Sequence, residues 1–524
     1  MIENKKNYLL IPSVPTPNGR LHLGHIGGPF LSVDILARSL RVCGHRAWII
    51  SGTDSYESYA AGKAEEENKD PEQIGHHYHA LIAEDLKLMN IQVDQFINPL
   101  AAPWSHSYQE WHEKIFQQLL NNKATSLLKE NIPWDEVNKR YLTGYWLHGN
   151  CPVCFKQTTS YFCENCGAHF RPEEIIQENN MPQKVVENIF LHLPHQVDLR
   201  SKGVNQYIET MFQNYCMQQN NLFRITTHCD WGLPDPSNPN NGRTLFSYGF
   251  IFAYFLMFGE LAGKLMGINK NAFANDSDVI TISSFGIDNA LPFLSSALGV
   301  SQGCPQYKSF DYYLVNYFYY LEGSKFSTSR QHMIGVEEAI HRKKLSSDII
   351  RLYLASLDVR NQTGNFVIND FVLYYNKTID WIETLIIQGM ENLVDTKSYF
   401  CDQHLKTQLY ELFAIQAHSL QPNCFLPHIA VHSIENWLPL GKGLHQKSGN
   451  YFWWLKGLTL LIYPYMPELG KALWSVLGYD DLPVMSDFFV LPARPLQKLK
   501  LRIKRIEQEF GVFKEEVTYE PNAL

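Results

Sequence analysis

The amino-acid sequence predicts an α/β protein in which a doubly wound parallel sheet, interrupted by an insertion, is followed by an α-helical bundle. Apolar runs typical of buried strands alternate with segments of helical periodicity on either side of residues 119–240. From about residue 340 onward the periodicity is almost entirely helical, which is typical of a bundle. A chain of 524 residues is too long for one hydrophobic core and should form several domains.

We place the domain boundaries where these patterns change. Residues 1–118 and 241–320 are expected to form the two halves of a Rossmann-like domain. Residues 119–240 form a connective insertion that holds a cysteine cluster and the stretch "GLPDPSNPNNG". Residues 321–370 are expected to link the sheet to a helical bundle at 371–524.

The first elements read as a strand, a turn, a helix and a second strand. "NYLLIPSV" (7–14) and "HRAWIISGTD" (45–54) carry the strand signal, and "GGPFLSVDILARSLRVCG" (27–44) has helical periodicity. Each strand ends in a sharp polar turn, at 12–25 and 51–57. Doubly wound sheets bind ligands beyond the carboxyl ends of their strands, so both turns should lie at one binding edge.

Composition and charge narrow the possible partners. A net charge of −8 and an isoelectric point of about 6.2 leave no generally basic surface, so we expect no DNA partner. The apolar stretch "FSYGFIFAYFLMFG" is shorter than the ~20 residues that span a bilayer, so no membrane partner is expected. Because the start lacks a secretory pattern, the sequence predicts a cytoplasmic protein.

Four of the ten cysteines lie within the short stretch "CPVCFKQTTSYFCENC". Cys151 and Cys154, followed by Cys163 and Cys166, form two Cys-x2-Cys pairs, a spacing at which four thiolates bind one Zn²⁺ ion. The alternative is two unlinked pairs of reduced thiols. Four thiolates leave no open position for chemistry, so the expected role of the zinc is structural.

The turn "PTPNGRLHLGH" after the first strand has features of a phosphate site. Pro15 helps to fix a tight turn, and Gly24 allows a ligand to approach the backbone closely. His22 and His25 are three residues apart, so on the first turn of a helix they share a face and could donate to a phosphate. The alternative is an ordinary helix start with two surface histidines.

These residues resemble a known family. "HLGH" is similar to the HIGH signature of class I aminoacyl-tRNA synthetases. "SGTDSYES", the four-cysteine insertion, "SSFGIDN" and "KFSTS" then follow in the order found in methionyl-tRNA synthetases, so the resemblance covers nearly the whole chain. It implies activation of an amino acid by ATP with Mg²⁺ and transfer of the acyl group from the adenylate to tRNA.

The resemblance also assigns roles in ATP binding. His22 and His25 would stabilise the α-phosphate, and Lys325 matches the first lysine of the family's KMSKS loop, which makes these three the expected catalytic residues. The second lysine of that loop is Thr328 here; Arg330 could replace it, or the loop could have decayed. The expected ATP-binding residues are Pro15, His22, Gly24, His25, Asp288, Asn289, Lys325, Ser327 and Ser329.

The amino-acid pocket is expected at Val14, Thr16, Asp54 and Phe293. The resemblance implies that Asp54 binds the α-ammonium of the substrate; from residue type alone, Asp54 could instead be a helix N-cap. Val14 and Thr16 stand where methionyl enzymes have Leu and Tyr, and Phe293 stands where they have His. Methionine is the first choice of substrate, and a different amino acid stays open.

The bundle differs from the family where the family reads the anticodon. Leu385 and Gly389 replace an Asn and Arg pair, which argues against recognition of a methionine anticodon. Trp381 or Trp437 could stack on bases, although aromatic residues in a helical stripe are more often core. "RPLQKLKLRIKRIEQEF" (494–510) is expected to be a basic amphipathic helix. With no appended dimerisation domain in the sequence, a monomer is expected.

Three functions stay open at this point. The first is an ATP-dependent methionine–tRNA ligase. The second is a related enzyme that activates another amino acid, for tRNA or for a different acceptor. The third is a non-catalytic protein that binds ATP, an amino acid or tRNA. A dehydrogenase is disfavoured because no Gly-x-Gly-x-x-Gly motif follows the first strand.

Overall fold

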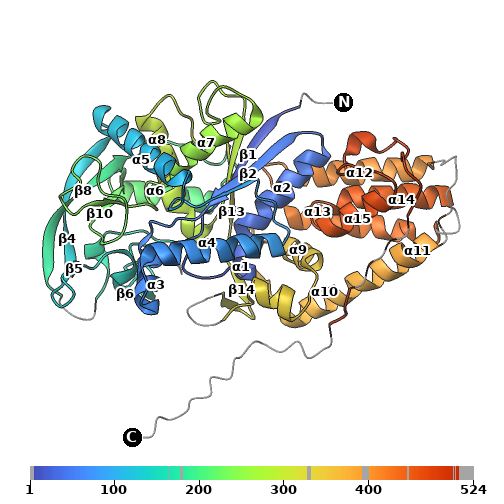
Figure 1. Cartoon of the computed structure of the whole chain (residues 1–524), viewed down its shortest axis with the longest axis horizontal. Coiled ribbons are helices and arrows are strands. Elements are labelled where there is room, and N and C mark those ends of the chain that lie inside the picture. The colour runs from blue at the N-terminus through green and yellow to red at the C-terminus, as the bar shows by residue number, and fades with distance from the viewer. Residues whose placement is uncertain are drawn as a thin grey trace, which may run out of the picture.

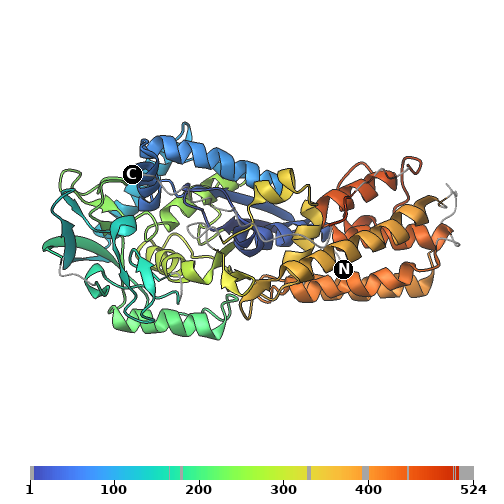
Figure 2. The same cartoon turned by 90° about the horizontal axis from the view of Figure 1, so that it is seen from below.

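The structure, a computed structural model, is elongated, with the sheet between the insertion and the helical bundle (Figure 1). A view turned by 90° shows the same three parts in a row (Figure 2). No helix in the described part of the chain is long and apolar enough to cross a membrane. The described residues are 5–163, 166–177, 181–326, 332–391, 393, 401–444, 448–497, 499, 501 and 503–506.

A five-stranded parallel sheet forms the centre of the molecule, as predicted. Its order is β13-β12-β1-β2-β3, so β1 and β12 are neighbours although more than half the chain separates them. From this pair the chain winds outward in both directions, which makes their carboxyl ends the topological switch point where such sheets bind ligands. The strands are β1 (Asn7–Pro12), β2 (Arg46–Gly52), β3 (Gln95–Ile97), β12 (Ile280–Gly286) and β13 (Tyr312–Asn316).

Helices cover both faces of this sheet, and local signals set their ends. Asp70 caps the helix that begins at Pro71, and Gly44 takes a left-handed φ of +89° just after the helix that ends at Val42. The helices are α1 (Leu23–His25), η1 (Ile26–Phe30), α2 (Leu31–Val42), α3 (Ser58–Glu67), α4 (Pro71–Leu88), α5 (Trp104–Asn121), α7 (Phe252–Met266) and α8 (Ala290–Gly303).

The insertion is built on a long antiparallel pair, β4 (Thr125–Asp135) and β8 (Gln183–His192). Between these strands the chain forms a small hairpin of β6 (His148–Asn150) and β7 (Gln157–Thr159), which carries the cysteine cluster. The remaining elements of the insertion are β5 (Arg140–Tyr141), η2 (Gly144–Trp146), η3 (Pro172–Glu174), α6 (Gln206–Gln218), β9 (Leu222–Arg224), β10 (Thr226–Thr227) and β11 (Thr244–Leu245).

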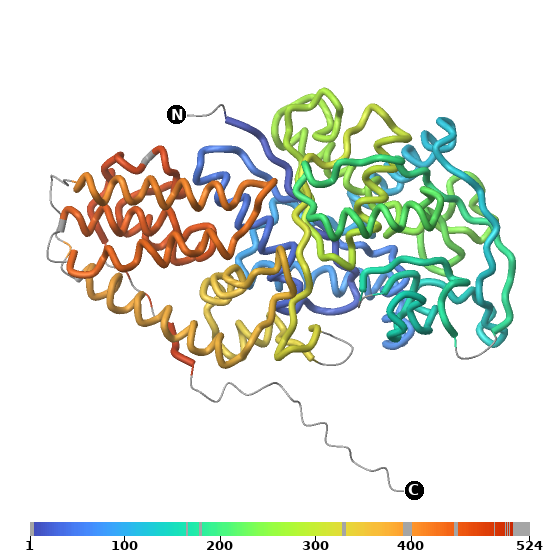
Figure 3. The backbone as a smooth tube through the Cα atoms, turned by 180° about the vertical axis from the view of Figure 1, so that it is seen from behind, coloured from blue at the N-terminus to red at the C-terminus, as the bar shows by residue number. Residues whose placement is uncertain are grey.

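A helical region follows the sheet, seen from behind in Figure 3. Two small strands, β14 (Tyr319–Leu321) and β15 (Ser324–Lys325), form a hairpin at its start, and β16 (Gly364–Phe366) pairs with β14. The helices are η5 (Glu338–Arg342), α9 (Ser347–Ser356), α10 (Ile368–Trp381), η6 (Ile382–Ile387), α11 (Gln388–Glu391), α12 (Gln403–Ser419), α13 (Pro427–Trp437), η7 (Leu438–Gly441), α14 (Ser448–Ile462), α15 (Pro467–Val476) and η9 (Met485–Asp487).

The prediction of a helix over residues 494–510 is wrong for those of its residues that the structure describes. Between 494 and 506 the described residues are not helical, and leucine and isoleucine side chains of this segment pack against the core. Asn376 of α10 holds its end, because the side-chain amide bonds both the N–H and the C=O of Ile506. Apolar contacts on an extended segment thus outweigh the helical periodicity of the sequence.

A buried cluster of charges joins the sheet to the bundle. Arg351 of α9 donates to the carboxylate of Asp34 on α2 over 2.6 Å, and both side chains are fully buried. Arg38 donates to the same carboxylate over 2.7 Å. Arg351 also donates to the carbonyls of Pro464 and Tyr465 in the bundle. Burial alone would raise the pKa of Asp34, but the two guanidinium groups outweigh it and lower that pKa.

Replacing Arg351 with alanine is expected to destabilise the protein by about 3–5 kcal/mol, because a buried ion pair and several carbonyl contacts lose their donor. Urea unfolding followed by circular dichroism would measure the change. Arg342→Ala is the control, since Arg342 is exposed and pairs with Glu337 at the surface, where a pair contributes at most about 1 kcal/mol. Equal losses in the two variants would contradict the inferred importance of the buried pair.

Candidate active site

Three turns meet at the switch point of the sheet. The turn after β1 is held to β12 by the N–H of Ser13, which donates to the carbonyl of Ser284 over 2.7 Å. The turn after β2 is held to the first turn by the N–H of Asp54, which donates to the carbonyl of Pro15 over 3.0 Å. The sheet therefore brings together the two turns that the sequence placed at one binding edge, and β12 adds residues 286–289 to them.

His22 and His25 fix each other at the start of the first helix. The N–H of His25 donates to Nδ1 of His22 over 3.2 Å, and the N–H of His22 donates to Nδ1 of His25 over 3.4 Å. The two rings stack with centroids 3.7 Å apart. Because each Nδ1 accepts a backbone hydrogen, the neutral tautomer of each ring carries its proton on Nε2. The motif thus presents two Nε2–H donors side by side.

Both imidazoles are held in the neutral form. Burial lowers the pKa of His22 well below its usual value, and the neighbouring His25 lowers it further. Desolvation by the surrounding protein also lowers the pKa of His25, although this residue is exposed to solvent. At neutral pH the pair can therefore donate hydrogen bonds to an anion without bringing a formal charge.

A carboxylate that the sequence analysis did not identify fixes the position of the histidine pair. Asp85 on α4 accepts from the guanidinium of Arg20 over 2.7 Å and from the N–H of Leu21 over 2.9 Å. These contacts fix the backbone just before His22. Asp85 lies 65 residues from Arg20 on an otherwise ordinary amphipathic helix, so no local signal in the sequence marks it.

Lys325 reaches the histidine pair from the β14–β15 hairpin. Its Nζ lies 3.7 Å from Oδ2 of Asp288. The positive charge of Lys325 contributes to lowering the pKa of both His22 and His25. The next residue, Phe326, stacks on the ring of His22 with centroids 5.2 Å apart. The remaining loop residues singled out in the sequence, Ser327, Thr328, Ser329 and Arg330, lie outside the described residues.

The chain returns to the same place after the loop. The N–H of Leu23 donates to the carbonyl of Ile334 over 3.0 Å, and the N–H of Val336 donates to the carbonyl of Leu21 over 3.1 Å. With Phe326 stacked on His22, described residues on both sides of positions 327–331 contact the histidine segment.

Asp288 and Asn289 lie between the lysine and the expected amino-acid pocket. Asn289 donates to Oδ1 of Asp288 over 3.1 Å and accepts a short hydrogen bond from the hydroxyl of Tyr248. Tyr248 in turn packs against Phe293. A continuous chain of contacts therefore runs from the pocket side to Lys325.

Asp54 carries a buried carboxyl group, and only one of its two oxygens accepts a hydrogen bond from the described residues. The hydroxyl of Ser247 donates to Oδ2 over 3.2 Å, whereas Oδ1 has no hydrogen-bond partner among the described residues. Burial raises the pKa of Asp54 to about 8, and the nearby carboxyl of Glu57 adds to the effect. The alternative role as a helix N-cap is wrong, because Glu57 caps α3 by accepting from the N–H of Tyr59.

Aromatic side chains pack tightly around the rest of the pocket. Phe293 is 3% exposed and contacts the rings of Phe255 and Phe285, while Val14 is buried and Thr16 half-buried. Beside Ser247 lies a narrow hollow with a free volume of about 10 Å³, room for roughly one water molecule. The structure thus places Asp54 and Phe293 in one region but shows no large chamber in this hollow.

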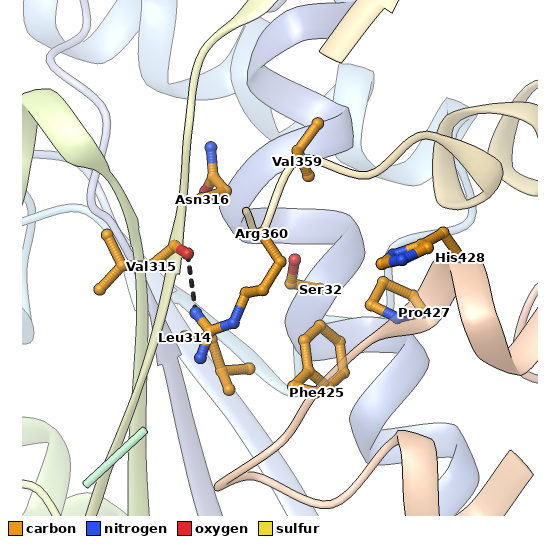
Figure 4. A pocket seen from close by; sticks show the side chains of 9 residues that line it. All are labelled: Ser32, Leu314, Val315, Asn316, Val359, Arg360, Phe425, Pro427 and His428. Atoms are coloured by element: carbon orange, nitrogen blue, oxygen red, sulfur yellow. Dashed lines mark hydrogen bonds between the residues drawn. The ribbon is translucent and has the colours of Figure 1, made fainter. Parts of the chain in front are cut away.

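A second narrow hollow lies at the junction of sheet and bundle, away from the histidine pair (Figure 4). Arg360 points into this junction from the segment before α10 and donates to the carbonyl of Val315 over 2.7 Å. Its guanidinium also donates to the backbone carbonyls of Gly203 and Tyr313. These contacts make the hollow part of the packing between domains.

Comparison with known proteins decides the family. Residues 8–386 match the model of the family described as tRNA synthetases class I (M). The chain belongs to this family. Proteins named methionine–tRNA ligase are similar over most of its length: that of Thermoplasma volcanium is 25% identical over 93% of this chain and 97% of its own, and that of Chlamydia abortus is 24% identical over 91% and 93%.

Solved structures of other proteins have a fold similar to that of this class I synthetase. A structure titled Mycobacterium tuberculosis methionyl-tRNA synthetase in complex with methionyl-adenylate superposes with a TM-score of 0.69, covering 95% of this chain and 99% of the other. At 14% sequence identity this likeness speaks for the fold alone. It agrees with the predicted parallel sheet, the cysteine-bearing insertion and the helical C-terminal region.

The cysteine cluster of the synthetase has the geometry of a metal site. The sulfur atoms of Cys151, Cys154, Cys163 and Cys166 all lie within 4.8 Å of one another. Cys151 and Cys166 are 3.8 Å apart and Cys154 and Cys163 3.5 Å, close to the edge of about 3.8 Å expected for a tetrahedron with Zn–S bonds of ~2.3 Å. None of the four is in a disulfide, so the set fits Zn²⁺.

Leu385 and Gly389, which the sequence analysis singled out, both lie against Tyr451 of the bundle. The hydroxyl of Tyr451 donates to the carbonyl of Leu385 over 2.8 Å, and a Cβ added at Gly389 would lie 2.3 Å from that hydroxyl. Trp437 is fully buried and exchanges indole-to-carbonyl hydrogen bonds with Trp454, so its interpretation as a core residue is confirmed. Trp381 also packs against the core.

Replacing Asp54 with asparagine is expected to remove a pH dependence of stability. Between about pH 4 and pH 8 the unfolded carboxyl is ionised while the folded one keeps its proton, so wild-type stability falls with rising pH by up to about 1.4 kcal/mol per unit. Urea unfolding at several pH values would show a flatter profile in Asp54→Asn. The exposed Asp276→Asn serves as control and should keep the wild-type slope; identical slopes in all three proteins would rule out the raised pKa.

The cysteine cluster is expected to bind about one Zn²⁺ ion per chain. Elemental analysis of the purified protein would measure the metal, and cobalt substitution would show thiolate charge-transfer absorption. Cys154→Ser should lose most of the metal and lower the thermal midpoint, whereas Cys43→Ser, at an exposed cysteine outside the cluster, should lose neither. Full metal content in Cys154→Ser would show that the ion lies elsewhere.

Proposed function

We propose that this class I synthetase uses ATP with Mg²⁺ to convert an amino acid, methionine as first candidate, into an aminoacyl-adenylate and transfers the acyl group to tRNA. The observation that carries the proposal is the pair of neutral Nε2–H donors on His22 and His25, which face Lys325 at the switch point of the sheet. Membership of the family supports the reaction class, and the similarity to methionine–tRNA ligases supports the choice of methionine.

In the proposed first step, a carboxylate oxygen of the amino acid attacks the α-phosphorus of ATP. The bond from that phosphorus to the leaving pyrophosphate breaks, and negative charge grows on the phosphoryl oxygens. His22 and His25 would donate to the α-phosphate, and Lys325 would leave Asp288 to neutralise the departing pyrophosphate. Donors held in position, such as the two histidines, stabilise charge as it develops.

We propose that Asp54 binds the α-ammonium of the substrate. Its unpartnered Oδ1 would gain a charge-assisted hydrogen bond, and the ammonium would stabilise the ionised carboxylate that burial disfavours. Val14, Thr16 and Phe293 would contact the side chain of the amino acid. The other proposed ATP contacts are Pro15, Gly24, Asp288, Asn289, Ser327 and Ser329.

The four thiolates of the insertion would hold a zinc ion whose role is structural, because all four positions of a tetrahedral ion are then occupied.

We further propose the division into a sheet domain of 1–118 and 241–320, an insertion of 119–240, a linking segment of 321–370 and a bundle of 371–524.

In the proposed second step, a ribose hydroxyl of tRNA attacks the carbonyl carbon of the adenylate and AMP leaves.

A second candidate function is activation of a different amino acid, or transfer to a different acceptor. The dense aromatic packing of Phe255, Phe285 and Phe293 supports a changed side-chain pocket. The contact of Tyr451 with Leu385 and Gly389 supports an acceptor chosen without the family's anticodon contacts. Both observations leave the proposed adenylation chemistry unchanged.

The decisive measurement is amino-acid-dependent ATP–pyrophosphate exchange across a panel of amino acids, on protein saturated with zinc. Methionine is expected to support exchange, and Lys325→Ala should slow it by about 10²–10³-fold because a cation at the developing charge is lost. Lys264→Ala is the matched control, since Lys264 lies at the surface of α7.

Each result of the panel leads to a different conclusion. Exchange with another amino acid and not with methionine would establish the second candidate. Exchange that is the same in Lys325→Ala as in wild type would remove Lys325 from the mechanism. Absence of exchange with every amino acid would reject the proposed adenylation.

A further inference from the structure

We propose that Tyr319 is a positioning residue that sets the spacing between the two halves of the phosphate site. One half is the helix segment that carries His22 and His25, and the other is the β14–β15 hairpin that carries Lys325. The proposal rests on the adenylation function inferred above, but it concerns a residue outside the family signatures. Tyr319 lies in β14 and is only 5% exposed.

The hydroxyl of Tyr319 bridges elements that are far apart in the sequence. It lies 3.0 Å from the carbonyl oxygen of Gly27, two residues after His25, and 3.2 Å from the carbonyl oxygen of Leu354 on α9. A hydroxyl has one hydrogen, so it donates to one of these carbonyls at a time and keeps both within reach. In Figure 1, β14, α1 and α9 are labelled close to one another in the middle of the molecule.

A kink in the histidine helix removes the regular α-helical partner of the Gly27 carbonyl. In a regular α-helix this oxygen would accept from the N–H four residues later, that of Leu31. Here the N–H of Leu31 bonds Ile26 and Gly28 instead, Gly28 has a non-helical ψ of −111°, and Pro29 has no N–H to offer. The hydroxyl of Tyr319 donates to this carbonyl in a place where the N–H of Leu31 does not.

The contact is close enough to act as a fixed spacer. A Cβ added at Gly27 would lie 2.8 Å from Cζ of Tyr319, so only glycine allows this approach. The ring edge of Tyr319 therefore rests directly on the backbone of the helix. The helix can neither move toward the hairpin nor away from it without losing packing or the hydrogen bond.

The backbone of Tyr319 continues the link to the lysine. Its carbonyl accepts from the N–H of Phe326 over 3.4 Å, and Tyr320 next to it is the register partner of Lys325. One residue thus holds the hairpin at its backbone and the histidine helix at its side chain. Displacing Tyr319 would move Lys325 relative to the Nε2–H donors, and misplacements of about 1 Å are costly for catalysis.

Tyr319→Phe tests this role, because it removes the hydroxyl and keeps the ring. Tyr353→Phe is the matched control: the hydroxyl of Tyr353 also donates to a backbone carbonyl, that of Val367 over 3.3 Å, and it is not part of the site. Calorimetric titration with Mg²⁺–ATP would give the affinity for ATP, and pyrophosphate exchange would give kcat and the KM of the amino acid. Thermal unfolding would report the stability of each variant.

We expect Tyr319→Phe to weaken ATP binding and to lower kcat, each by about tenfold, with the KM of the amino acid unchanged. Tyr353→Phe should match the wild type in all three quantities, while the two variants lose similar amounts of thermal stability. Equal ATP affinity and kcat in the two variants would overturn the proposal, because Tyr319 would then be an ordinary buried tyrosine.

The outcomes separate this proposal from the function on which it rests. If wild-type protein binds ATP but exchanges pyrophosphate with no amino acid, the adenylation function fails and the ATP affinities of the variants still decide the role of Tyr319. If wild-type protein does not bind ATP, both proposals fail. Gly27→Ala provides a second variant, because its Cβ pushes the same contact apart from the helix side and should weaken ATP binding similarly.

Discussion

The buried pair of Asp34 and Arg351 is the interaction on which the arrangement of the whole chain depends. Asp34 lies on the helix that continues from the histidine segment, and Arg351 lies on α9 of the linking segment, from which it also donates to two carbonyls of the bundle. Two guanidinium groups share one carboxylate, so the desolvation of three charged groups is offset only if all of them stay in place. The sheet and the bundle are therefore joined by a contact that tolerates little sliding.

The proposed active site is assembled from turns that each belong to a different part of this frame. The histidine segment follows β1, Asp54 follows β2, and Asp288 follows β12, while Lys325 comes from a hairpin next to the bundle. In the proposed reaction the neutral histidines would donate hydrogen bonds without adding charge, and Lys325 would supply the positive charge. A site built in this way depends on the relative placement of rigid elements more than on any single loop.

Much of the fold around the candidate site could be predicted from the sequence, because the patterns that indicate its strands and turns lie within short stretches of the chain. The strand, the turn and the spacing of the two histidines around His22 predict, without knowledge of distant residues, that the two rings lie side by side after β1. Asp85 and Tyr319 could not be found, because each acts on a turn or helix that lies far along the chain. The helix expected at 494–510 failed because periodicity does not reveal whether apolar residues pack as a helix or along an extended path. Glu57 rather than Asp54 caps α3, a choice that only the backbone geometry decides.

The contact of residues on both sides of positions 327–331 with the histidine segment has a consequence for how this site can change over time. The segment before the loop is fixed through Phe326, and the segment after it through Ile334 and Val336. These contacts are made by residues outside 327–331, so a difference such as threonine instead of lysine at position 328 would change the local charge and leave the contacts in place. Residues 327–331 could therefore differ in composition, and with them the rate or the reaction partner, while the flanking contacts of Phe326, Ile334 and Val336 are kept.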